Sequence, residues 1–192
     1  MSLPEDVLFG LLLGFSLVIP PGPMNAWIVA ASARSFREGF VTGLGAMTAD
    51  AVLGAAVFAL DRSVDLGAVL RGVYAVGAVV MLYLALRLLR RAPGPVGGDG
   101  ETVAFVRALG LGVSNPYQIV WWLTAGVAFA YLGGVPLLLG LFGAIAVWIV
   151  AFPWSVRAGA RRHPSIERAA GFASGAILVG FAVYFALLAV LG

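Results

Sequence analysis

Long apolar runs dominate the chain, and charged residues fall between them. The runs lie at 7–33, 39–60, 72–89, 108–131, 135–156 and 169–191. Each approaches or exceeds the roughly 20 residues that a helix needs to cross the hydrocarbon core of a bilayer. They do not alternate with period two, which favours helices over the strands of a barrel. The pattern therefore predicts an all-α integral membrane protein with six transmembrane helices.

A segment rich in proline and glycine divides these runs into two groups of three. It starts as Ala-Pro-Gly-Pro-Val-Gly-Gly-Asp-Gly at position 92 and cannot continue a helix. We therefore expect one membrane domain over residues 1–192. Within it, residues 1–91 form a first repeat, 92–103 a cytoplasmic linker, and 104–192 a second repeat.

The two halves share a weak self-similarity. Residues 77–82 match 175–180 and residues 45–47 match 143–145 at an offset of 98, and the Gly-Pro-Met-Asn at 22–25 lies over the Asn-Pro-Tyr-Gln at 115–118 at an offset of 93. Because each half has three spans, the second would enter the membrane upside down, a common plan in secondary transporters. The alternative is that helices rich in glycine and alanine resemble one another by composition alone.

Prolines interrupt the first and fourth spans. The first contains Pro20, Pro21 and Pro23 within one apolar run, and the fourth contains Pro116 after Ser-Asn. Proline lacks an amide hydrogen and its ring clashes with the preceding turn, so we expect both helices to be broken near the middle of the membrane. The alternative is that the prolines only kink them.

Two interrupted helices that meet at one depth indicate a transport site, and the half-helix N-termini that follow the breaks would suit a carboxylate. The predicted substrate-binding residues are Pro21, Gly22, Pro23, Asn25, Asn115, Pro116, Tyr117 and Gln118.

Asp50 is the one acid near the middle of a predicted span. A carboxylate there costs about 2.5 to 3.5 kcal/mol, so such a residue normally faces the bundle interior and has a function. Uptake and release of a proton at Asp50 is a plausible coupling step. The alternative is a structural hydrogen bond to Asn25, Ser16 or a backbone carbonyl. The offset of 98 places Trp148 at the equivalent position of the second half.

The arginines predict the orientation. All 12 basic residues are arginine, and 10 of them fall in the loops after the first, third and fifth spans. The positive-inside rule places these loops in the cytoplasm, so we expect a multi-pass protein of the plasma membrane with both termini extracytoplasmic. The segment before the first run has two acids and no base, which is atypical of a signal peptide.

Composition removes several classes of function. The chain is 61% hydrophobic and 11% charged, has no cysteine, and has one histidine, His163, in an arginine-rich loop. We therefore expect no metal site, no cofactor and no thiol chemistry. No nucleophile and base set suggests an enzyme, and no basic cluster suggests a nucleic-acid partner.

Several short motifs in order resemble the lysine-exporter (LysE-type, RhtB-like) family. They are Pro-Gly-Pro-Met-Asn at 21–25, Arg-Ser-Phe-Arg-Glu-Gly-Phe at 34–40, Gly-Leu-Gly at 43–45 leading to Asp50, and Asn-Pro at 115–116. The resemblance covers essentially the whole chain. It implies a small secondary exporter of amino acids or their derivatives, driven by the proton gradient and often a homodimer.

Together the residues and the resemblance predict a proton-coupled exporter of a small zwitterionic or cationic solute. Two other interpretations stay open at this point. One is a transporter or channel for another small solute or an inorganic ion, and the other is a membrane scaffold or accessory subunit.

Overall fold

A computed structural model describes residues 3–59, 66–90, 100–123, 134–162 and 165–191, and regular structure within these ranges is helical. The helices are α1 (Leu3–Val18), α2 (Pro23–Arg34), α3 (Phe36–Ala59), α4 (Leu66–Arg90), α5 (Glu101–Val113), α6 (Pro116–Trp121), α8 (Gly134–Arg162) and α9 (Ser165–Leu191). Helices therefore lie in each of the predicted apolar runs, although the fourth run is described only as far as residue 123.

The lengths and apolar composition of these helices identify a multi-pass membrane protein. Among the described residues, α3, α8 and the Phe172–Val190 part of α9 are long and apolar enough to cross a bilayer. Helices α1 and α2 pass the same test together as one broken span bent by 78°, which makes up to four candidate spans. Residues 124–133, in the predicted fourth span, lie outside the described residues.

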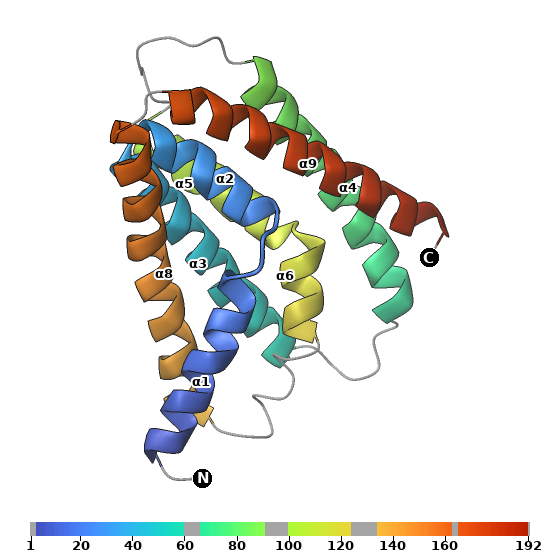
Figure 1. Cartoon of the computed structure of the whole chain (residues 1–192). Helices are drawn as coiled ribbons and strands as arrows, with labels where there is room; N and C mark the ends of the chain where they lie inside the picture. The colour runs from blue at the N-terminus through green and yellow to red at the C-terminus, as the bar shows by residue number, and fades with distance from the viewer. Residues whose placement is uncertain (1–2, 60–65, 91–99, 124–133, 163–164, 192) are drawn as a thin grey trace.

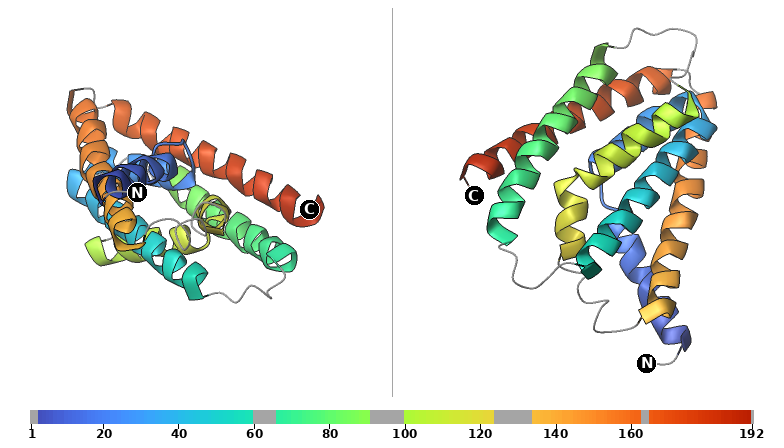
Figure 2. Two further views of the ribbon diagram at one scale, coloured as in Figure 1. Left: turned by 90° about the horizontal axis from the view of Figure 1, so that it is seen from below. Right: turned by 180° about the vertical axis from the view of Figure 1, so that it is seen from behind.

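Three helix pairs, the central helix α2 and the short helix α6 make up the described part of the bundle (Figures 1 and 2). Helix α1 lies along α8, α3 lies along α5, and α4 lies along α9. Helix α2 contacts α3, α5, α8 and α9, so it occupies the middle of the bundle. Helix α3 belongs to the first half of the chain and α5, α8 and α9 to the second, so α2 is surrounded by helices from both halves.

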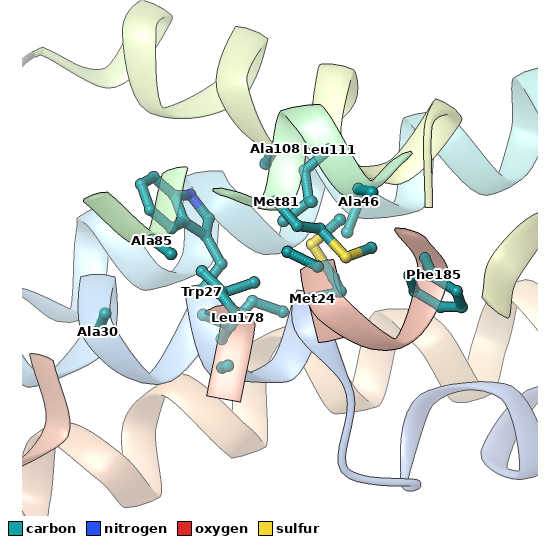
Figure 3. Packing of buried hydrophobic residues seen from close by; sticks show 14 residues of the cluster. Met24, Trp27, Ala30, Ala46, Met81, Ala85, Ala108, Leu111, Leu178 and Phe185 are labelled. Carbon is teal, nitrogen blue, oxygen red and sulfur yellow. The ribbon is translucent and has the colours of Figure 1, made fainter. Parts of the chain in front are cut away.

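Helix α2 is buried nearly all round because most of its side chains are small and apolar. Met24 and Trp27 supply its larger side chains, and they join a cluster that includes Met81 of α4 and Leu178 of α9 (Figure 3). Its alanines are also buried and let the neighbouring helices approach closely. The central position of α2 thus follows from its composition.

Glycines allow close contacts between α1 and α8 and between α3 and α5. At the α1–α8 contact, a Cβ atom on Gly140 would lie 2.1 Å from the carbonyl oxygen of Val7 and 2.8 Å from the nitrogen of Leu11. At the α3–α5 contact, a Cβ atom on Gly45 would lie 2.5 Å from the carbonyl oxygen of Phe105 and 3.1 Å from the nitrogen of Leu109. A larger side chain at either glycine would push the paired helices apart.

Several helix ends with arginines meet at one end of the bundle, the top in Figure 1. Arg34 forms an ion pair with Glu38 at 3.0 Å, and Arg37 of α3 pairs with Glu101 at the start of α5. Arg157 of α8 donates a hydrogen bond to the carbonyl oxygen of Ala33 in the last turn of α2, at 2.6 Å. This end is therefore held by polar contacts between helices.

The start of α5 differs slightly from the predicted boundary. Helix α5 begins at Glu101, three residues before the expected start of the second repeat. Gly100 precedes the helix at a positive φ of 77°. Glycine adopts this conformation without the steric cost that a side chain would bring. Residues 92–99 of the predicted linker lie outside the described residues.

Candidate functional site

The predicted break in the first span is confirmed. Helix α1 ends at Val18 and α2 begins at Pro23, with Pro at the first helical position. The break frees carbonyl oxygens that a continuous helix would use. The side-chain nitrogen of Asn25 donates to two of them, the oxygen of Val18 at 2.6 Å and that of Pro20 at 3.0 Å. Asn25 therefore holds the broken segment in place, as lipid-embedded backbone requires.

The predicted break in the fourth span is confirmed as well. Helix α5 ends at Val113 and α6 begins at Pro116. Asn115 is the N-cap residue of α6, and its side-chain oxygen accepts a hydrogen bond from the backbone nitrogen of Tyr117 at 3.1 Å. The hydroxyl of Ser114 donates to the carbonyl oxygen of Gly110 at 2.7 Å. Side chains next to the proline thus satisfy the interrupted backbone.

The two helix N-termini at the breaks differ in one respect. The N-cap residue of α2 is Gly22, which has no side chain to cap the helix, whereas the side chain of Asn115 caps α6. The first-turn N–H groups of a helix lack intrahelical partners and favour negative charge. Because no side chain caps α2, its N-terminus is the one of the two that can bind an anion.

Asp50 of α3 is buried and accepts two hydrogen bonds on one oxygen. Its Oδ1 receives the side-chain nitrogen of Gln118 at 3.0 Å and the indole nitrogen of Trp122 at 3.0 Å. The alternative expectation of a bond to Asn25 or Ser16 is wrong. The amide of Asn25 binds elsewhere, and the hydroxyl of Ser16 donates to the carbonyl oxygen of Leu13 at 2.7 Å.

A second tryptophan contacts the break in the first span. Trp148 of α8 donates its indole N–H to the side-chain oxygen of Asn25 at 3.2 Å, and its ring stacks on Phe152 with centroids 4.6 Å apart. The bonds from Trp148 to Asn25 and from Gln118 to Asp50 both join a residue of one half of the chain to a residue of the other. The site therefore forms where the two halves meet.

A cavity of about 40 Å³ lies between the two breaks. It has room for only a few water molecules. Its lining residues come from α1, α2, α3, α6, α8 and the two breaks: Leu17, Val18, Pro20, Gly22, Pro23, Met24, Asn25, Ile28, Ala46, Asp50, Asn115, Tyr117, Gln118, Ile145, Trp148 and Ile149. Of these described residues, Asp50 is the only one with a carboxyl side chain, and none is basic. The cavity is thus apolar with a few polar groups, which is typical of small-molecule sites.

Most of the residues predicted from sequence line this cavity, including Asn25, Asp50 and Gln118. Two do not. Pro21 is exposed, and Pro116 packs against α4, where a Cβ atom on Gly77 would lie 2.7 Å from its ring. Tyr117 lies at the edge, and its hydroxyl donates to the carbonyl oxygen of Ser16 at 3.4 Å.

Sequence reasoning missed the roles of Trp122 and Trp148. The sequence predicts Trp148 only as the counterpart of Asp50 in the second half, and it predicts no partner for Trp122. One signal was present for Trp122, which follows Gln118 by four positions. Residues at that spacing lie on the same face of a helix, so a donor at 118 predicts that position 122 points the same way.

Comparison with known proteins identifies the chain's relatives at the level of a family. The family model described as "LysE type translocator" matches residues 15–189. That range contains both helix breaks, Asp50 and all the cavity-lining residues. No match was found among curated proteins or among solved structures.

Proposed function

Because the chain belongs to the LysE type translocator family, whose members are transporters of small solutes and not enzymes, we propose that it exports amino acids or small related solutes by proton exchange. We place the solute in the cavity between the two helix breaks. The observation that carries the proposal is the position of Asp50, the one carboxyl group in a lining that has no basic residue.

The cavity offers partners for both charges of a zwitterion. The carboxylate of Asp50 would bind an amino group, and the uncapped N-terminus of α2 would bind a carboxylate. Gly22 and Pro23 line the cavity, so this helix end faces it. The amide groups of Asn25 and Asn115 also line the cavity, where they hold the two helix breaks in place.

Coupling follows from the chemistry of one carboxyl group. A protonated Asp50 is neutral and no longer attracts a cationic amine, whereas the carboxylate does. Proton and solute would therefore occupy Asp50 in turn, and a proton entering from outside would displace a solute bound from inside. A transporter of this kind needs alternating access, in which one group of helices moves against the other around the site.

The size of the cavity indicates what must move. At about 40 Å³ it is too small for an amino acid. Helices around the cavity must therefore separate to admit solute. The contact of Asn25 with Trp148 joins two residues of the cavity lining that come from different halves of the chain, and we expect it to loosen in that step.

Two features support a plan of six helices in two inverted three-helix repeats. Each helix of the first half runs opposite to its counterpart in the second: α1 to α5, α3 to α8, and α4 to α9 (Figure 1). The glycine contacts also correspond, because Gly140 meets Val7 and Leu11 as Gly45 meets Phe105 and Leu109. The two pairs of neighbours are 98 positions apart and the two glycines are 95 apart, so the likeness is between the helix pairs and does not follow one fixed offset.

We also propose that the protein lies in the plasma membrane with both termini outside the cytoplasm. The support is the cluster of arginine-bearing helix ends at one end of the bundle, which the positive-inside rule assigns to the cytoplasm. In this orientation α2 runs from the cavity to the cytoplasmic surface.

Transport by purified protein in liposomes tests the function. We expect saturable uptake of at least one amino acid when a pH gradient is imposed, and loss of that uptake in Asp50→Asn. Glu101→Gln is the matched control, because it also converts an acid to an amide but lies half exposed and outside the cavity.

The same preparation is screened with the twenty amino acids and with common inorganic cations. Saturable transport of a cation alone would overturn the assignment to amino acids, and conductance without saturation would indicate a channel. Equal uptake by Asp50→Asn and the unmodified protein would exclude Asp50 as the coupling group. No transport of any solute would favour a scaffold.

A further inference from the structure

The two carboxyl oxygens of Asp50 differ in their hydrogen bonds. Both donors, Gln118 and Trp122, bind Oδ1 at 3.0 Å. Oδ2 receives no hydrogen bond from the part of the chain that the structure describes. Asp50 also lines the cavity. One oxygen is thus occupied by the protein, while the other remains for a ligand.

The orientation of the Gln118 amide is fixed by a series of hydrogen bonds that starts at the backbone. The nitrogen of Tyr117 donates to Oδ1 of Asn115 at 3.1 Å. The Nδ2 of Asn115 donates to Oε1 of Gln118 at 3.0 Å, which leaves Nε2 of Gln118 to face Asp50. A backbone N–H can only donate, so each later group has one allowed orientation.

The position of the Trp122 indole is fixed by a glycine. Gly54 lies one helical turn after Asp50 on α3, and a Cβ atom there would lie 2.8 Å from Cη2 of Trp122 and 2.9 Å from Cζ3. The far edge of the ring therefore lies at Gly54 and its N–H lies at Asp50. Trp122 is buried and does not line the cavity, so it is placed to hold Asp50 and not to touch a solute.

We propose that Gln118 and Trp122 are positioning residues that hold Oδ1 of Asp50, so that proton and solute exchange at Oδ2 alone. Gly54 is the third part of this arrangement, because its missing side chain makes room for the indole. The inference rests on the proposed function of Asp50 in transport. It also changes the predicted role of Gln118, which acts mainly on Asp50 and not on the solute.

Three variants test this arrangement. Trp122→Phe keeps an aromatic ring and removes the N–H donor, Gln118→Met removes the amide at similar length, and Gly54→Ala displaces the indole from outside the cavity. Trp154→Phe and Gly180→Ala are the matched controls, since Trp154 is 65% exposed on α8 and a Cβ atom on Gly180 would meet no described atom within 4 Å beyond its own stretch of helix.

The kinetic readout separates positioning from structure. If the carboxyl group samples several orientations, the fraction that can bind solute falls, and the apparent KM rises by the inverse of that fraction. We expect KM to rise about tenfold in each variant, in line with the loss of one hydrogen bond to a charged group, with Vmax changed less than about twofold. A purely structural role would instead lower the amount of folded protein and hence Vmax.

A spectroscopic readout does not depend on transport. The carboxyl stretching band of protonated Asp50 is identified in the infrared difference spectrum by its loss in Asp50→Asn. The frequency of this band should shift in Trp122→Phe and Gln118→Met, because both substitutions remove a hydrogen bond to Oδ1. It should be unchanged in both controls. Combining Gly54→Ala with Trp122→Phe should raise KM by less than the product of the single effects, because both act through one ring.

The outcomes distinguish this inference from the function beneath it. If Asp50→Asn loses transport while the three variants match the controls in KM and the Asp50 band does not move, the positioning role is wrong. If Asp50→Asn transports normally, the proposed function fails, and the infrared band still decides whether Oδ1 is held. If Trp122→Phe does not fold, Gln118→Met and Gly54→Ala carry the test.

Discussion

The side-chain oxygen of Asn25 accepts a hydrogen bond from the indole nitrogen of Trp148 at 3.2 Å, although 123 positions separate the two residues. The amide nitrogen of Asn25 is already used, because it donates to the carbonyl oxygens of Val18 and Pro20. One side chain thus stabilises the break in the first span and fastens it to α8.

Replacing Asn25 should therefore cost more than replacing Trp148. Asn25→Ala leaves two carbonyl oxygens without their donor, for which we expect a loss of about 1 to 3 kcal/mol in stability. Asn25→Asp should lose nearly as much, since it keeps the acceptor and removes the donor. Trp148→Phe removes only one bond and should lose less. Melting temperatures in detergent measure the order, and an Asn25→Ala variant as stable as the unmodified protein contradicts it.

The close contact of α1 with α8 predicts a sensitive glycine. In Gly140→Ala the new methyl group would overlap the backbone of Val7 and Leu11, and backbone atoms cannot rotate away. We expect a destabilisation of about 1 to 3 kcal/mol, as for other overpacked sites. Gly143→Ala, three residues later on α8, is the control, because its Cβ atom would lie 3.8 Å from Leu11 Cδ2, an ordinary contact. Equal melting temperatures for the two variants would show that the contact is looser than described.

Arg157 should stabilise the C-terminus of α2. Its guanidinium donates to the carbonyl oxygen of Ala33 in the last turn, where a positive charge also complements the helix dipole. We expect Arg157→Gln to lose about 1 to 2 kcal/mol of stability. Arg161→Gln, at an exposed position one turn later, should lose much less. Thermal unfolding of both variants decides whether the hydrogen bond or only the net charge matters.

The proposed orientation can be tested with cysteines, because the chain has none of its own. Arg71→Cys in α4 and Thr102→Cys at the start of α5 both place a thiol at an exposed position. A maleimide that cannot cross membranes should label the cysteine at 71 in intact cells and should label that at 102 only after the cells are opened. The reverse pattern would place the arginine-rich end outside.

Local chemistry explains why the helix breaks could be predicted. Three prolines within one apolar run cannot continue a helix, whatever the rest of the fold, and α1 duly ends at Val18 and α2 begins at Pro23. The same reasoning gave the break before Pro116. The burial of Asp50 was predictable too, because an acid in the middle of an apolar run is costly in lipid unless it faces the protein interior.

The partners of these residues could not be predicted in the same way. Sequence reasoning suggested Asn25 or Ser16 as partners for Asp50, whereas Gln118 and Trp122 bind it from positions 68 and 72 residues away. Which side chains meet depends on the depth and rotation of each helix in the bundle. An apolar run leaves both undefined, because every face of such a helix is compatible with lipid.

The sequence by itself therefore determined that this is a membrane protein, where its helices break, and which acid is buried, since each of these depends on the local cost of placing a residue in lipid. Only the tertiary structure decided how the polar groups are shared. It paired Asn25 with Trp148 and gave Oδ1 of Asp50 to Gln118 and Trp122. Those pairings depend on close contact between helices from both halves of the chain, which forms only when glycines and small side chains let the helices pack together.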